Sequence, residues 1–184
     1  IGRKLGQGGF GITYLGFDLK LKTKLAIKEY YPSGIAVRST INRTVMNASR
    51  DVAEDFKQGM DKFLEEARTL ARFEDYPNIV SIRDYFEYNG TAYMVMEYLE
   101  GRTMLKYLKD HGGVISFDET IKILAPIMDV LNEVHASGLI HRDISPDNVF
   151  IADSGQVKLL DFGAAKSAMA LVNQQSHSIL LKKG

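Results

Sequence analysis

The sequence predicts an α+β fold, in which an antiparallel sheet with one helix is followed by a mainly helical part. Three observations predict this fold. Residues 12–17 and 25–28 are rich in β-branched, aromatic and aliphatic side chains, which is typical of strands. The pair Asn89-Gly90 between two apolar runs is a strong hairpin signal. Residues 61–73 and the stretch after Ser116 repeat apolar side chains with a helical period.

The composition indicates a globular chain with a substantial core. Of the 184 residues, 45% are hydrophobic and 25% are charged, and 23 acidic residues balance 23 basic ones. The zero net charge argues against a nucleic-acid-binding protein held by phosphate neutralisation. Without cysteine the chain forms neither disulfides nor thiolate metal sites. Since no long apolar run occurs, we expect no membrane segment in this stretch and a cytoplasmic location.

Residues 6–11 form the glycine pattern G-x-G-x-x-G, which is weak evidence on its own. Glycines let the backbone approach phosphate groups closely. In a dinucleotide-binding protein a helix follows such a loop, whereas here the strand-like residues 12–17 follow it. The pattern therefore predicts a hairpin loop that lies over the phosphates of a nucleotide.

The next elements are a strand, a long segment and a helix. Leu-Ala-Ile-Lys at 25–28 predicts a third strand, and residues 29–60 then separate it from the helix at 61–73. Within that segment, residues 35–46 favour a small hairpin and residues 51–60 favour an early start of the helix. A regulatory or docking role and a tolerated surface elaboration both stay open for this segment. On the helix, Glu66 shares the flank of Phe63 and Leu70, whereas Glu65 points about 100° away.

The remaining elements alternate strands and helices. Residues 77–82 and 91–96 predict two strands, residues 97–101 a connection, and residues 103–109 a short helix. Ser116 and Glu119 form a capping box for a long helix that Gly138 ends and Pro126 is expected to kink. Its predicted buried stripe consists of Ile121, Leu124, Ile127, Met128, Leu131 and Val134.

The stretch from residue 141 to 163 carries the strongest functional signal. It contains His-Arg-Asp-Ile-Ser-Pro-Asp-Asn at 141–148 and Asp-Phe-Gly at 161–163, with short apolar runs between them. Asp143, Asn148 and Asp161 can converge at one end of a small hairpin, where they would hold a divalent metal and orient a hydroxyl. In this order and spacing the residues resemble the eukaryotic-like protein kinases, whose signature is H-R-D-x-x-x-x-N followed by D-F-G.

The resemblance implies a role for each residue of the predicted site. Asp143 would be the base that orients the acceptor hydroxyl, and Asn148 and Asp161 would hold Mg²⁺ on the phosphates. Lys28, in a stretch that looks like V-A-I-K, would reach the α and β phosphates and pair with Glu66. The residues implied to contact ATP are Gly6, Gln7, Gly8, Gly9, Phe10, Gly11, Thr13, Ala26, Lys28, Met96, Glu97, Leu99 and Phe150.

The family also implies how the lobes divide and connect. Residues 1–98 would form the N-lobe and residues 99–184 part of the C-lobe, with the hinge near Glu97 and Leu99. A column of four side chains would couple the lobes: Leu70, Ile82, His141 and Phe162. Arg142 is the kind of residue that pairs with a phosphate on the activation segment. The serines there that could be phosphorylated, with none preferred, are Ser167, Ser176 and Ser178.

Two residues depart from the family pattern. Thr13 stands where the family has valine, and its methyl group can still pack on an adenine ring. Ser145 stands where protein serine/threonine kinases carry a lysine that touches the transferred phosphate. A missing cation removes stabilisation of the transition state. Certain bacterial kinases look similar here, so the active interpretation is retained, with Lys28 and Mg²⁺ or another basic residue supplying the charge.

Both ends of the sequence look cut. The chain starts without methionine in a strand-like stretch and stops 21 residues after Gly163. We expect much of the second lobe to be missing, this stretch alone to transfer no phosphate, and tethering through missing regions to stay open.

The predicted function is that of an ATP- and Mg²⁺-dependent, bacterial-like Ser/Thr protein kinase. It would transfer the γ-phosphoryl group to a protein, or to itself by autophosphorylation, and bind no nucleic acid. Two alternatives stay open. One is a pseudokinase or nucleotide-binding regulatory module, suggested by Ser145 and the segment 29–60. The other is a small-molecule phosphotransferase of related fold, although such enzymes usually carry His-Gly-Asp instead of His-Arg-Asp.

Overall fold

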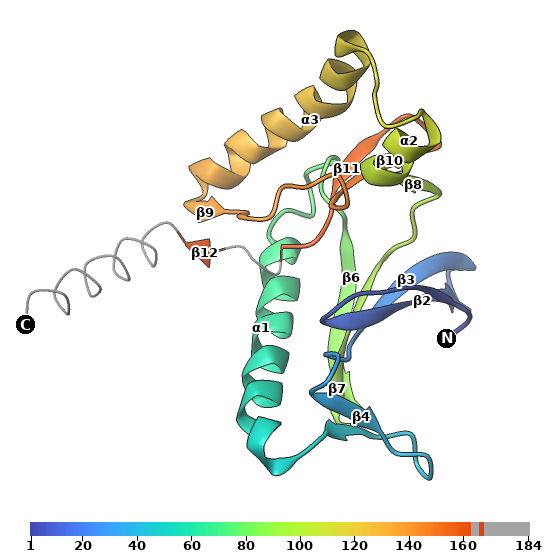
Figure 1. Cartoon of the computed structure of the whole chain (residues 1–184), viewed down its shortest axis with the longest axis vertical. Helices are drawn as coiled ribbons and strands as arrows, with labels where there is room; N and C mark the ends of the chain where they lie inside the picture. Colours follow the sequence, from blue (N-terminus) through green and yellow to red (C-terminus); the bar gives the residue numbers. More distant parts are fainter. Residues whose placement is uncertain (163–165, 168–184) are drawn as a thin grey trace, which may run out of the picture. The chain divides into compact units, whose positions relative to one another are not determined.

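The computed structural model describes residues 1–162 and 166–167 (Figure 1). These residues form two compact units. The first unit consists of Ile1–Asp75 and Val80–Leu99, and the second of Tyr76–Ile79 and the chain from Glu100 on. The first is mainly a sheet with one long helix, and the second contains two helices and short strands. The predicted α+β class is thus confirmed, while the boundary predicted after residue 98 stays a prediction.

A five-stranded antiparallel sheet forms the centre of the first unit. Its strands are β1 (Lys4–Gln7), β2 (Gly11–Asp18), β3 (Thr23–Tyr30), β6 (Ile82–Tyr88) and β7 (Thr91–Glu97), in the order β1-β2-β3-β7-β6. Neighbouring strands are all antiparallel. Asn89 and Gly90 join β6 to β7 with φ of 51° and 72°, as a tight hairpin turn requires.

The strand predicted at residues 77–82 is wrong. The strand that pairs with β7 is β6, which starts at Ile82, and Tyr76–Ile79 belongs to the second unit. Ile79 there makes a parallel bridge to Leu159, and the Asn78 amide donates to the Val157 carbonyl at 2.7 Å. Residues 77–82 resemble a strand in the sequence because they include the apolar core residues Ile79 and Val80. The sequence does not predict β6, because residues 83–88 are all exposed and show no alternation of buried and exposed side chains.

The long helix of the first unit starts earlier than its apolar stripe. Helix α1 spans Ala53–Ala71, after a short 3-10 turn η1 at Arg50–Val52, so residues 51–60 do begin the helix early. Its buried residues are Phe56, Phe63, Leu64, Glu66, Ala67 and Leu70. α1 packs against β6 and β7. Phe73, expected inside the helix, is buried just beyond its end.

The small hairpin predicted within residues 35–46 is confirmed. Strands β4 (Ala36–Arg38) and β5 (Val45–Asn47) pair antiparallel, with Val37 opposite Met46. The amide of Val45 donates to the carbonyl of Asn89 at 2.7 Å, which attaches the hairpin to the β6–β7 turn. The segment 29–60 is therefore folded onto the sheet of its own unit.

The second unit contains α2 (Met104–Asp110), α3 (Phe117–Ala136) and a three-stranded sheet. The sheet has the order β11-β10-β8, formed by β11 (Val157–Leu159), β10 (Val149–Ala152) and β8 (Gly101–Thr103). Strand β9 (Leu139–Ile140) pairs with β12 (Lys166–Ser167). Ser116 caps α3 by accepting from the Glu119 amide at 3.2 Å, but the Glu119 carboxylate accepts from the Tyr107 hydroxyl, so only this half of the predicted capping box is observed.

The predicted buried stripe of α3 is wrong in two places. The fully buried residues are Ile123, Ile127, Val130 and Val134, at spacings that place them on one face. Ile121 and Met128 are 44% and 63% exposed because they lie on the opposite side of the helix. The prediction combined two apolar faces, of which the described chain covers one. No helix in residues 1–162 or 166–167 is both long and apolar enough to cross a membrane.

Candidate active site

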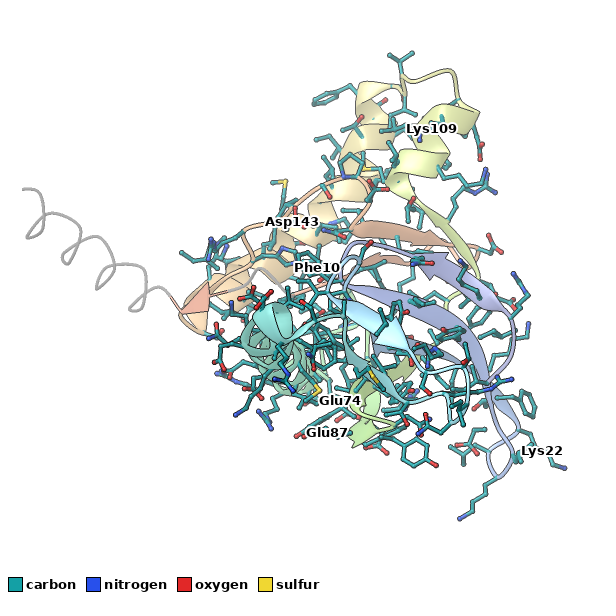
Figure 2. All side chains as sticks on the ribbon, turned by 60° about the horizontal axis from the view of Figure 1, so that its bottom comes forward. Phe10, Lys22, Glu74, Glu87, Lys109 and Asp143 are labelled. Atoms are coloured by element: carbon teal, nitrogen blue, oxygen red, sulfur yellow. The ribbon has the colours of Figure 1, made fainter. Side chains whose placement is uncertain are left out.

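The glycine pattern lies at the turn between β1 and β2. Gly6 and Gln7 pair with Thr13 and Ile12, and the amide of Gly8 donates to the carbonyl of Gly11 at 3.0 Å. Figure 2 labels Phe10 at this turn, where its side chain is 79% exposed. A Cβ on Gly11 would lie 2.3 Å from the carbonyl oxygen of Glu29, so the close approach of β3 requires glycine there.

Lys28 and Glu66 form an ion pair within the first unit. The Nζ of Lys28 lies 3.0 Å from Oε1 of Glu66, and the two side chains are only 18% and 6% exposed. The lysine also lies 5.7 Å from the ring centroid of Phe63. Glu65 is exposed, as its helical position indicated. The pair fixes the ammonium group of Lys28 relative to α1.

Four predicted ATP contacts share one face of the sheet. Thr13 is the cross-strand neighbour of Lys28, and Ala26 is the neighbour of Met96. Since side chains two positions apart on a strand point to the same face, Ala26 and Lys28 lie on one side of β3. The small side chains of Thr13 and Ala26 and the apolar side chain of Met96 thus lie on the face of the sheet that carries Lys28.

The predicted hinge residues lie at the end of β7 and just beyond it. The amide of Glu97 donates to the Ser81 carbonyl at 3.1 Å, and its carboxylate accepts from the Ser81 amide at 2.8 Å. Leu99 is half-buried and is the last residue of the first unit. Phe150 lies in β10 of the second unit, opposite Thr103 and Lys158.

The second unit brings Asp143 and Asn148 together in the loop between β9 and β10. The Asn148 amide nitrogen donates to the carbonyl of Asp143 at 2.9 Å and to its Oδ2 at 3.0 Å. The carbonyl of Asn148 accepts from the amide of Leu160 at 2.8 Å, which places it beside the residue before Asp161. Figure 2 labels Asp143 in this loop, where it is exposed. The carboxylate is thus oriented by one hydrogen bond and still accessible to a substrate.

The backbone is strained at both ends of this constellation. Arg142 has φ of 71° and Asp161 has φ of 51°. Residues other than glycine rarely adopt this left-handed backbone conformation. Such conformations persist where the surrounding structure holds them, and they concentrate at functional sites. One of the two positions is Asp161 itself, and the other directly precedes Asp143.

His141 and Phe162 form the buried part of the site. His141 is 1% exposed, and its ring contacts that of Phe162 edge-on at a centroid distance of 4.5 Å. Nδ1 accepts from the Asp143 amide at 3.3 Å, so the proton lies on Nε2, which donates to the Leu160 carbonyl at 3.2 Å. Burial lowers the pKa of His141, which keeps this ring neutral. The other members of the predicted column, Leu70 and Ile82, are buried in the first unit.

The donor set at Asn148 and Asp161 fits Mg²⁺. This cation prefers oxygen ligands and is bound through one or two protein groups plus substrate phosphates. Because the nitrogen of Asn148 is used by Asp143, its amide oxygen is the end that can face a cation. No group of three or more His, Cys, Asp or Glu side chains that could hold a metal ion occurs in the described part of the chain.

Of the remaining predicted residues, Arg142 is exposed and Ser145 is half-buried. The backbone N–H of Asn148 donates to the carbonyl of Ser145 at 3.0 Å. Gly163, Ser176 and Ser178 lie outside the described residues, and only the backbone of Ser167, in β12, is described.

A polar cluster surrounds Glu29, and no motif of the sequence predicted it. This carboxylate is 1% exposed and accepts from the hydroxyls of Tyr14 at 3.0 Å and Tyr93 at 2.7 Å, and Arg38 lies 2.6 Å from it. Burial and the hydrogen bond to Glu29 raise the pKa of Tyr93 to about 12, so its hydroxyl stays a donor. The one signal available was that Tyr14 and Glu29 alternate with Thr13 and Lys28 on their strands.

The fold and the geometry define a two-unit α+β protein with a lysine–glutamate pair in one unit and an aspartate–asparagine loop in the other. The protein kinase domain family matches residues 1–179, and the chain belongs to this family. It is 33% identical over 166 residues to a probable serine/threonine-protein kinase of Bifidobacterium longum, covering 90% of this chain and 20% of that protein.

Two further comparisons agree. The serine/threonine-protein kinase PrkC of Bacillus subtilis is 32% identical over 178 residues, which cover 97% of this chain and 24% of that protein. A solved structure, the PpkA-294 apo form, superposes with a TM-score of 0.82 at 34% identity, covering 96% of this chain and 61% of that one. The chain therefore spans about a fifth to a quarter of the length of these curated relatives.

Proposed function

We propose that the full-length protein is an ATP- and Mg²⁺-dependent protein kinase that phosphorylates serine or threonine. The observation that carries the proposal is the presence of both ordered pairs, Lys28–Glu66 at 3.0 Å and Asp143–Asn148 at 3.0 Å. Catalysis of phosphoryl transfer depends mostly on positioning and charge stabilisation, and each pair positions one group that such a reaction needs.

Each residue has a defined part in this reaction. The glycine turn and Lys28 hold the phosphates, and Thr13, Ala26 and Met96 line the base. Asp143 orients the acceptor hydroxyl and takes its proton. The hydroxyl oxygen forms a bond to the γ-phosphorus, and the bond between that phosphorus and the bridging oxygen breaks, which releases ADP. Asn148 and Asp161 would hold Mg²⁺, which neutralises charge on the phosphates when bound.

The finer assignments belong to the same proposal. Residues 1–98 form the N-lobe and residues 99–184 part of the C-lobe, with the base held by the backbone of Glu97 and Leu99. The acceptor is a protein of a cytoplasmic signalling pathway, or the kinase itself by autophosphorylation. The similarity to bacterial proteins named serine/threonine-protein kinases supports this acceptor class.

The test is transfer of radiolabelled γ-phosphate from ATP with Mg²⁺ by the full-length protein and by its Asp161→Asn variant. The acceptors are the protein itself, a generic basic protein, and a set of hydroxylated small molecules. We expect label on protein with the unmutated enzyme and a loss of at least about 10²-fold with the variant. ATP binding without any transfer would favour the pseudokinase, and label on small molecules alone would favour a small-molecule phosphotransferase.

A further inference from the structure

Adjacent residues of β3 point to opposite faces of the sheet, and here both carry charge. Lys28 faces α1, where it pairs with Glu66. Glu29 therefore faces the other side of the sheet, where its carboxylate is almost completely buried. The strand that presents the phosphate-binding lysine is thus held by ionic contacts on both faces.

The partner of Glu29 comes from the segment between β3 and α1. Arg38, the last residue of β4, places Nη2 2.6 Å from Oε2 of Glu29. A buried carboxylate needs a paired cation and hydrogen-bond donors, and Arg38 supplies the cation while Tyr14 and Tyr93 supply hydroxyl donors. Since Tyr14 lies in β2 and Tyr93 in β7, the cluster connects three strands of the sheet to the β4–β5 hairpin (Figure 1).

The same segment is hydrogen-bonded to the glycine turn. The amide of Tyr31 donates to the carbonyl of Phe10 at 3.1 Å, and the amide of Ser33 donates to the carbonyl of Gly9 at 2.9 Å. The guanidinium carbon of Arg38 lies 5.2 Å from the ring centroid of Tyr31. Arg38 therefore touches both the residue next to the phosphate-binding lysine and the residue that holds the glycine turn.

We propose that Arg38 is a positioning residue for nucleotide binding. The β4–β5 hairpin is then a brace that fixes the position of the glycine turn relative to Lys28. This inference rests on the proposed function, because it assigns to the nucleotide the groups that the brace orders. It replaces the interpretation of residues 29–60 as a tolerated surface elaboration. A molecule that displaced the hairpin would weaken ATP binding without touching the ATP site.

The experiment measures the Kd of the full-length protein for a fluorescent ATP analogue with Mg²⁺, and the KM for ATP and for the protein acceptor. Arg38→Met removes the brace contact and is expected to weaken nucleotide binding about tenfold with the acceptor KM unchanged. Arg38→Lys keeps the charge and is expected to restore most of the affinity. Arg43→Met is the matched control, since it removes the same charge from an exposed position in the same hairpin connection.

A second variant guards against loss of folding. Arg38→Met with Glu29→Gln leaves no buried unpaired charge and should fold, yet it should still bind ATP about tenfold more weakly because the brace is lost. Parent-like affinity in folded Arg38→Met, or in the double variant, would overturn the inference. A Lys28→Met variant separates the two proposals: if it binds ATP weakly while the Arg38 variants do not, the brace alone fails. If Lys28→Met also binds like the parent, the proposed nucleotide site fails and the brace with it.

Discussion

At the scale of single residues, His141 shows how a buried polar side chain orders the loop that carries Asp143. Both ring nitrogens are used, Nδ1 by the Asp143 amide and Nε2 by the Leu160 carbonyl. The arrangement needs a neutral ring, because a protonated Nδ1 would present a second N–H to the amide of Asp143. The loop that holds Asp143 therefore depends on the neutral state of the buried His141 ring.

This dependence predicts a loss of stability in acid. Burial lowers the pKa of His141 in the folded state, so below the ordinary histidine pKa of about 6.5 the unfolded chain binds more protons than the folded chain. The contribution of the neutral ring is complete above about pH 6.5 and is lost as the pH falls. Urea unfolding at pH 7.5, 6.5 and 5.5 should show a falling free energy of unfolding.

The variant His141→Asn should lose the part of this pH dependence that the ring causes. The control is His111→Asn, since His111 is an exposed histidine of the same unit. A pH dependence that stays unchanged in His141→Asn and disappears in His111→Asn would contradict the assignment.

At the scale of elements, the β6–β7 turn does more than reverse the chain. Gly90 has φ of 72°, and a Cβ at this position would lie 2.3 Å from the carbonyl oxygen of Val45. The turn is therefore packed against β5, whose amide at Val45 donates to Asn89. The glycine serves both the hairpin geometry and the attachment of the β4–β5 hairpin.

Gly90→Ala should consequently cost more than an ordinary glycine substitution. The left-handed backbone conformation costs about 1–2 kcal/mol for alanine, and the forced contact with Val45 adds about 1–3 kcal/mol. Gly34→Ala is the matched control, because Gly34 has φ of 77° in the same unit and no atom near the added Cβ. Denaturant unfolding should give a larger loss for Gly90→Ala, and equal losses would show that the contact with β5 carries no energy.

At the scale of the whole molecule, the proposed reaction needs side chains from both units. Lys28 belongs to the first unit and Asp143 to the second. In the proposed reaction the lysine that binds phosphate and the aspartate that orients the acceptor thus come from separate parts of the chain. Substitutions in the two units should therefore differ in their effects on ATP binding and on the rate of transfer.

Asp143→Ala in the full-length protein should lower the rate of transfer by about 10²–10⁴-fold and leave ATP binding largely unchanged. Lys28→Met should weaken ATP binding and also lower the rate. Because residues that act in one transition state are not additive, the double variant should lose less than the product of the single losses. Single-turnover transfer of labelled phosphate measures all three, and a fully multiplicative loss would indicate that the two residues act independently.

The sequence by itself determined the local features of this protein. Spacing or turn chemistry within a few residues predicts each of three features. These are the hairpin at Asn89-Gly90, the strand that follows the glycine turn, and the helix that carries Glu66. The order of Asp143, Asn148 and Asp161 predicts the protein kinase family, which the match to residues 1–179 confirms. Such features are local because backbone conformation and side-chain periodicity depend on near neighbours.

Only the tertiary structure decided which buried groups meet across distant segments. Glu29 is paired by Arg38 and Tyr93, and the amide of Asn78 is used by β11. Likewise, the face of α3 that is covered was decided by packing, which leaves Met128 exposed. Periodicity shows that a face is apolar but not what packs on it, and a buried charge finds its partner through the path of the whole chain. The proposed brace, the β4–β5 hairpin, therefore depends on contacts between residues that are distant in the sequence.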